Sequence, residues 1–265
     1  MPAFYADRVD VTDAWGRLVD ALRVEAPITL AALRPGARPE EIAVAEQRTG
    51  VSWPDSYREW FACVNGSTQT PETWGEAGFL LPGFTLFSLD DVVSQHAMFL
   101  DSWERPDDAD AASFYATPPI EAGMVANTFL PSFLPFAGLD GYLLFCDARP
   151  GAAHGCIAEF AAENADTGGT LYPNLASLLD ALTAAVVGRT HFLHFSPVVT
   201  AGRLEWPLDD DEVLPAVDAD LLPPPSTVPL VEESPRPRDD GDGYLVVTLG
   251  VPSEATGRTG EELRP

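Results

Sequence analysis

The chain has 265 residues and a formal charge of −26, because 41 acidic residues stand against only 15 basic ones, all of them arginine. This acid excess disfavours binding to nucleic acid or to an anionic membrane, whereas it would attract a basic partner. Hydrophobic residues make up 46% of the sequence, so a wholly disordered chain is excluded. Acidic residues outnumber basic ones both in residues 1–190 and in residues 191–265, so the negative charge is not confined to one part of the chain.

The sequence carries no membrane-targeting pattern. Its apolar runs are much shorter than a membrane span, and residues 1–7 lack a basic region followed by an apolar one. We therefore expect a cytoplasmic protein. The three cysteines, at 63, 146 and 156, have no metal-ligand spacing and are expected to be buried as small hydrophobic residues.

Three helices are predicted in the first quarter of the chain, at 12–25, 39–49 and 54–64. Pro39 suits the first position of the second helix, where its missing N–H has no partner. The third helix has an apolar stripe at i, i+3, i+4 and i+7. Its residues are Tyr57, Trp60, Phe61 and Val64. Asn65-Gly66 is predicted to end it with a left-handed stop.

Short strands and a further helix are predicted next. Residues 78–82 and 84–87 have strand composition, and Ser88 with Asp91 resembles a capping box that starts a helix. Residues 104–128 then interrupt the pattern with acidic residues and prolines, which indicates a surface insertion.

The second half predicts a strand–turn–strand unit and a long helix. Residues 138–141 are expected to form a turn, and 142–146 and 155–160 to form strands. Asn174 is placed to cap a leucine-rich helix. A closing strand is expected within 198–206.

An ordered set of short motifs resembles the SMI1/KNR4 family of the SUKH superfamily. These motifs are Leu33-Arg34-Pro35-Gly36, Glu40-Glu41-Ile42, Gly50-Val51, Pro54, Tyr57-Arg58-Glu59-Trp60-Phe61, Asn65-Gly66, Phe133-Leu134-Pro135, Asp140-Gly141, Asp147, Pro150-Gly151 and Glu159-Phe160. The resemblance covers roughly residues 12–187. It implies an α+β fold in which helices surround a central antiparallel sheet, and it implies an adaptor, regulatory or toxin-immunity role.

The chain is accordingly divided into two parts. Residues 1–206 are predicted to form the SMI1/KNR4-like domain, and residues 207–265 an acidic, proline-rich and largely disordered tail. Within that tail, 244–249 are strand-like in composition.

One cluster of residue types could in principle support hydrolysis. Cys156, His154 and Asp147 supply a thiol, an imidazole and a carboxylate, which are the groups of a nucleophile, a base and an orienting acid. No nucleophile-loop signature accompanies them, so a turn histidine and a core cysteine are the preferred interpretation.

No cofactor or metal site is predicted. His191 and His194 lie in a segment that alternates like a strand, which would turn their side chains to opposite faces. The acidic run 209–212 lacks the spaced ligands of a calcium loop.

We therefore expect a non-enzymatic protein-interaction module. The resemblance and the acidity together favour a bacterial immunity protein that binds and neutralises a basic, nuclease-like toxin domain. A regulatory scaffold of the SMI1/KNR4 type and a Cys/His hydrolase remain as alternatives. The candidate partner contacts are the acidic side chains of the insertion, Glu104, Asp107, Asp108 and Asp110.

Overall fold

The computed structural model describes residues 10–69, 73, 75–102, 121–126, 128–162 and 169–207. The helices are α1 (Val11–Glu25), α2 (Pro27–Ala31), α3 (Pro39–Thr49), α4 (Asp55–Cys63), α5 (Leu89–Ser102) and α7 (Leu175–Gly188). The strands are β1 (Leu33–Pro35), β2 (Val64–Ser67), β3 (Thr85–Leu86), β4 (Phe133–Leu139), β5 (Tyr142–Asp147), β6 (Ile157–Ala161), β7 (Val198–Thr200) and β8 (Arg203–Glu205). Most of the predicted insertion and all of the predicted tail beyond 207 lie outside these residues.

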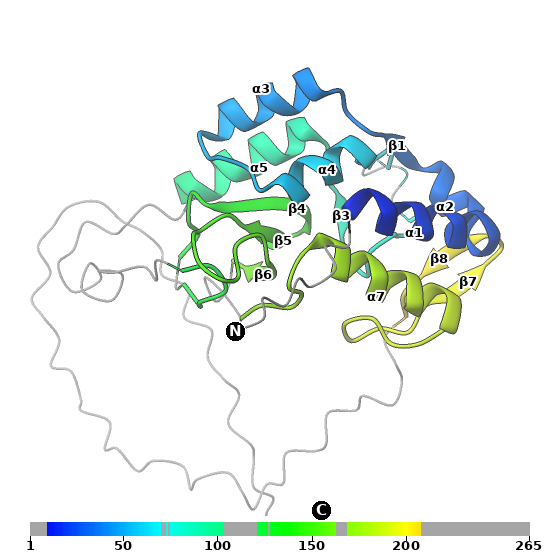
Figure 1. The fold of residues 1–265 in the computed structure, drawn as a ribbon. Coiled ribbons are helices and arrows are strands. Elements are labelled where there is room, and N and C mark those ends of the chain that lie inside the picture. The colour runs from blue at the N-terminus through cyan, green and yellow to red at the C-terminus, as the bar shows by residue number, and fades with distance from the viewer. Residues whose placement is uncertain are drawn as a thin grey trace, which may run out of the picture. The chain divides into compact units, whose positions relative to one another are not determined.

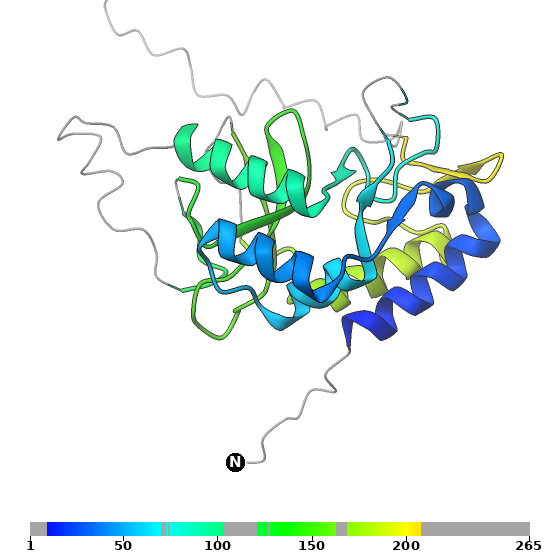
Figure 2. The ribbon, with the colours of Figure 1, turned by 90° about the horizontal axis from the view of Figure 1, so that it is seen from above.

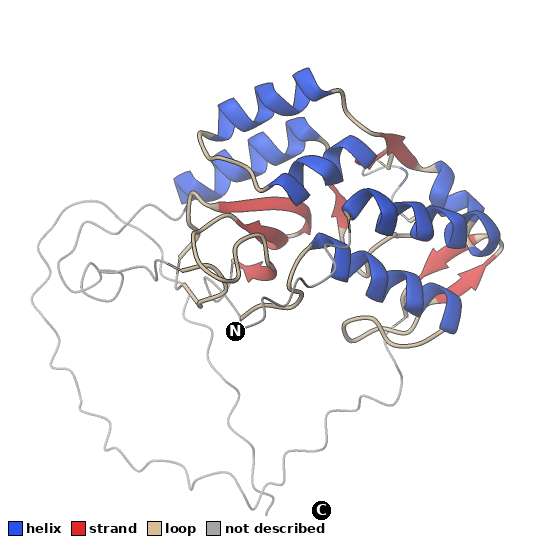
Figure 3. Cartoon of the chain, viewed as in Figure 1, coloured by secondary structure: helices blue, strands red, loops and turns tan. Residues whose placement is uncertain are grey.

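The predicted α+β class is confirmed by a four-stranded antiparallel sheet with helices packed around it (Figures 1 and 3). The strand order is β3-β4-β5-β6, which follows the chain. Asp140 and Gly141 both have positive φ angles, 49° and 89°, and they close the β4–β5 hairpin. The predicted turn at 138–141 is therefore too long, because β4 continues to Leu139.

Four of these helices form two packed pairs. The ribbon seen from two directions places α1 along α7 and α3 along α5 (Figures 1 and 2). Arg17 of α1 donates a hydrogen bond to the carboxylate of Asp180 on α7, with Nη2 2.6 Å from Oδ1. The predicted side-chain caps are present, since Asn174 accepts from the Ser177 N–H and Ser88 accepts from the Asp91 N–H.

An aromatic cluster joins α4 to the sheet and forms the centre of the core. Trp60 contacts Trp15 of α1 on one side and Phe136 of β4 on the other, with ring centroids 5.8 Å and 5.4 Å apart. The Tyr57 hydroxyl donates to the Pro135 carbonyl at 2.8 Å. Tyr57, Trp60 and Phe136 are buried, and their contacts fix the position of α4 relative to β4.

Asn65-Gly66 does not end the helix as predicted, although Gly66 takes the predicted left-handed conformation with a φ of 82°. Helix α4 ends at Cys63, and Val64 is already extended as the first residue of β2. Gly66 instead permits close packing, because a Cβ there would lie 2.6 Å from the backbone nitrogen of Ser88. The left-handed stop occurs at Gly50, which ends α3 with a φ of 69°.

Three strand predictions also need correction. Residues 78–82 form turns and isolated bridges, one of which pairs Gly78 with Leu204. Residues 191–197 form a turn closed by backbone hydrogen bonds between Phe192 and Phe195. The closing strand expected within 198–206 is a hairpin of β7 and β8, because Ala201 and Gly202 take the positive φ angles that reverse the chain.

Within the described residues, every helix falls short of the length and apolar character that a membrane span requires.

Candidate functional site

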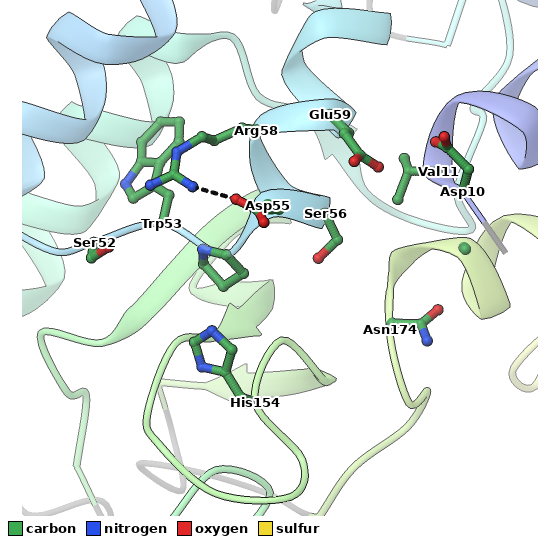
Figure 4. Close-up of a pocket in the computed structure, with 12 residues that line it drawn as sticks. Asp10, Val11, Ser52, Trp53, Asp55, Ser56, Arg58, Glu59, His154 and Asn174 are labelled. Atoms are coloured by element: carbon green, nitrogen blue, oxygen red, sulfur yellow. Dashed lines mark hydrogen bonds and ion pairs between the residues drawn. The ribbon is translucent and has the colours of Figure 1, made fainter. Parts of the chain in front are cut away.

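Three helices begin around one surface pocket of about 510 Å³. Its walls come from the first residues of α1, α4 and α7, together with the turn that carries His154 (Figure 4). We call this cavity the helix-start pocket. The lining residues used below are Asp10, Asp55, Ser56, Arg58, Glu59, His154 and Asn174.

Polar caps build the wall of the helix-start pocket. Asp10 Oδ1 accepts the Thr12 N–H at 2.8 Å at the start of α1, and Asn174 does the same for Ser177 at the start of α7. The first N–H groups of a helix otherwise lack partners, so these short polar residues are expected at such positions. The caps therefore place carboxylate and amide oxygens at the mouth of the cavity.

The charge of the helix-start pocket is predominantly negative. Asp10, Asp55 and Glu59 contribute carboxylates, and Arg58 is the one arginine in the lining. Arg58 is occupied by two acidic partners, since its guanidinium donates to Asp55 at 2.8 Å and to Glu46 at 2.6 Å. The pocket thus suits a group that donates hydrogen bonds and carries positive charge.

The carboxylates of α1 and α4 act together on Cys63 beside the helix-start pocket. Burial raises the pKa of the Cys63 thiol, a hydrogen bond with Thr12 opposes that shift, and the charges of Glu59 and Asp10 raise the pKa further. In Figure 4, Glu59 points across the opening toward Asp10. A thiol in this environment stays protonated, so Cys63 is not an activated nucleophile.

The residues of the hydrolase alternative do not form a catalytic relay. The Asp147 carboxylate accepts from Arg149, with Nη2 2.7 Å from Oδ2, and from the Gly123 N–H at 2.9 Å. His154 Nδ1 donates to the Arg149 carbonyl at 2.9 Å. Burial raises the pKa of the Cys156 thiol, although a hydrogen bond with Thr170 opposes the shift. A nucleophilic cysteine needs the opposite shift, so this arrangement lacks the activated thiol that the hydrolase alternative requires.

The remaining histidines lie apart from the helix-start pocket. His191 Nδ1 lies 3.2 Å from the Ser196 hydroxyl, and His194 lines a different cavity. In the part of the chain that the structure describes, no group of three or more His, Cys, Asp or Glu side chains is placed to hold a metal ion.

The partner contacts predicted from the sequence, Glu104, Asp107, Asp108 and Asp110, lie outside the described residues and stay a prediction. The sequence analysis did not single out the helix-start pocket. A weak signal existed, because an aspartate directly before a helical pattern, such as Asp10, is a typical cap. Nothing in the sequence indicated that the start of α1 would lie near the starts of α4 and α7.

The fold defines a small α+β domain with helices packed around an antiparallel sheet. The family model of the SMI1/KNR4 family (SUKH-1) matches residues 36–181, which run from just before α3 into α7. The chain therefore belongs to the SMI1/KNR4 family (SUKH-1). A comparison with curated proteins gives no match.

Proposed function

We propose that the protein is an immunity protein that binds a basic toxin domain and blocks it. Membership of the SMI1/KNR4 family supports a role in protein–protein interaction. The sequence adds a charge of −26, which would attract a positively charged partner over a distance of several ångströms.

The observation that carries this proposal is the acidic helix-start pocket. Asp10 and Glu59 come from different helices and lie on one cavity, whose single arginine already has acidic partners. A lysine or arginine of the toxin domain would meet carboxylates there. Asp10 is a helix cap and Glu59 lies within α4, so both carboxylates would be held by helices before a partner arrives.

The inhibition would be steric and electrostatic. A basic toxin that acts on an anionic substrate presents its positive charges at the substrate site, and an acidic protein bound there would occlude that site. We propose that Glu104, Asp107, Asp108 and Asp110 of the insertion add to the attraction, since loops commonly carry the variable part of recognition. The helix-start pocket would then supply the contacts that do not vary from one toxin to another.

A protection assay tests this function. A toxin domain from a gene found beside this one would be expressed in a bacterial host with and without this protein, and survival would be measured; a neighbourhood without a toxin gene would count against the proposal. We expect survival to be restored by the wild type and reduced by the double variant Asp10→Asn/Glu59→Gln. Asparagine caps a helix about as well as aspartate, so the variant removes charge without removing the α1 cap.

The matched control is Asp20→Asn/Asp101→Asn, which removes the same formal charge from exposed positions outside the helix-start pocket. Equal protection by the wild type and by both double variants would show that the protein confers immunity without the charges of the helix-start pocket. Failure of the wild type to protect against an adjacent toxin would overturn the immunity role itself.

A further inference from the structure

A second cavity, of about 400 Å³, has a different chemistry from the helix-start pocket. We call it the apolar slot. Its walls are formed by the loop before β3, the β4–β5 turn, β6 and the turn after α7. The apolar side chains in this lining are Phe84, Leu139, Tyr142, Leu171, Leu193 and Phe195.

Large apolar side chains are left in contact with solvent at the apolar slot. Leu171 is 41% exposed and Tyr142 is 36% exposed. Apolar surface that is gathered in a concave site, rather than scattered singly, is characteristic of a binding site. The apolar slot therefore has the properties of a preformed site.

A carboxylate lies within this apolar lining. Glu159 is the half-buried member of β6, in which its neighbours Ala158 and Phe160 are buried, and it pairs across the sheet with Leu144. Burial raises the pKa of the Glu159 carboxyl, whereas the charge of His194 lowers it by a smaller amount. The apolar slot therefore offers a half-buried carboxylate among apolar walls.

We propose that the apolar slot binds an arginine side chain presented by a protein partner, with the guanidinium at Glu159 and the stem against the apolar walls. An arginine side chain combines an apolar stem with a planar cation that stacks on aromatic rings, and Tyr142, Phe84 and Phe195 offer such rings. The charges are complementary, because Asp140 and Glu159 are acidic and His194 is the one basic residue in the lining. Lysine fits less well, since its ammonium is compact and more strongly hydrated.

This inference concerns a different surface from the helix-start pocket, and it does not depend on the immunity role. The two sites share no lining residue. An arginine bound in the apolar slot would be recognised by shape and stacking, whereas the helix-start pocket offers mainly carboxylates and hydroxyls.

The test compares two small probes that differ in charge and hardly in shape. The probes are N-acetyl-arginine amide and its neutral isostere, N-acetyl-citrulline amide. Each would be titrated into the ¹⁵N-labelled full chain, with the amide signals of Tyr142, Glu159 and Leu171 followed by NMR. We expect the arginine probe to shift these signals and to bind at least about tenfold more tightly than the citrulline probe, which is the scale of one charge-assisted hydrogen bond.

Two variants locate the binding. Glu159→Gln should bring the affinity of the arginine probe down to that of the citrulline probe, while Leu171→Ser should weaken both. Asp101→Asn on α5 removes one charge outside the apolar slot and should leave both affinities unchanged. Because burial already opposes the charge of Glu159, the glutamine variant is expected to fold.

Equal shifts by the two probes, or a preference for arginine that persists in Glu159→Gln, would overturn the proposal. So would arginine shifts confined to the signals of Asp10, Glu59 and their neighbours, since those would place the probe in the helix-start pocket.

Discussion

Arg149 folds back onto Asp147, two residues earlier in the chain, so that both charges are buried together. Only 6% of the Arg149 side chain and 1% of the Asp147 side chain are exposed. The guanidinium also donates to the Met124 carbonyl at 2.6 Å and lies 5.0 Å from the centroid of the Phe133 ring. The ion pair thus links the end of β5 to residues 121–126, through Arg149 to the Met124 carbonyl and through Asp147 to the Gly123 N–H.

Removing one member of this ion pair should be costly. Arg149→Met leaves the Asp147 carboxylate buried without its cation, and we expect the free energy of unfolding to fall by about 3–5 kcal/mol. Urea denaturation measures this change. The double variant Asp147→Asn/Arg149→Met should recover part of the loss, because it no longer buries a charge. A double variant no more stable than the single one would show that charge burial is not the cause.

Trp60 tests the aromatic centre of the core. Its side chain is 1% exposed and contacts rings from α1 and β4, so Trp60→Ala should lower the free energy of unfolding by about 3–5 kcal/mol. Val44 on α3 is 55% exposed, and Val44→Ala should change stability by about 0.5 kcal/mol or less. Near-equal denaturation midpoints for the two variants would contradict this description of the core.

His96 should make stability depend on pH. Burial lowers the pKa of its imidazole, and the hydrogen bond from Nε2 to the Pro131 carbonyl only partly opposes that shift. The unfolded chain therefore binds a proton at a higher pH than the folded chain does. The contribution of neutral His96 to the free energy of unfolding is fully present above the pKa of the unfolded chain, near 6.5. It is lost as the pH falls toward the lower pKa of the folded chain.

Thermal melting of the wild type and of His96→Gln between pH 5 and 8, a window chosen around the ordinary histidine pKa of about 6.5, measures this dependence. The difference between the two melting temperatures should shrink on acidification, because only the wild type loses stability through this group. A constant difference across the range would rule out His96 as the titrating residue.

The predicted domain boundary can be tested by limited proteolysis. The sequence beyond 208 is acidic and rich in proline, so we expect proteases to remove much of residues 209–265 and to leave a core with cooperative melting. The truncated chain 1–208 should melt within a few degrees of the full chain. Loss of cooperative melting on truncation would move the boundary into the tail.

Local sequence signals predicted the elements well, and tertiary contacts account for what they missed. Asn174 and the Ser88–Asp91 pair were found because a cap acts within three residues of itself. The left-handed conformation of Gly66 was predicted, but its position inside β2 was not, because it depends on packing against the distant backbone of Ser88.

The candidate site depended even more on distant contacts. Asp10 and Asn174 line one cavity only because α1 packs along α7, and a sequence pattern carries no information about that pairing. The apolar slot likewise joins Glu159 of β6 to His194 in a turn after α7. Net charge, by contrast, needs no fold, and the basic partner that it predicts from composition alone stays a prediction.

The most direct test of the proposed function takes a toxin domain from a gene found beside this one and measures the rate at which it associates with this protein at different salt concentrations. Exposed charges steer an encounter over roughly the Debye length, about 10 Å at 0.1 M salt. We predict that association is fast at low salt, slower for Asp10→Asn/Glu59→Gln, and unchanged for Asp20→Asn/Asp101→Asn, with the three rates converging at high salt. An association rate indifferent to salt and to both double variants would contradict recognition through the acidic helix-start pocket.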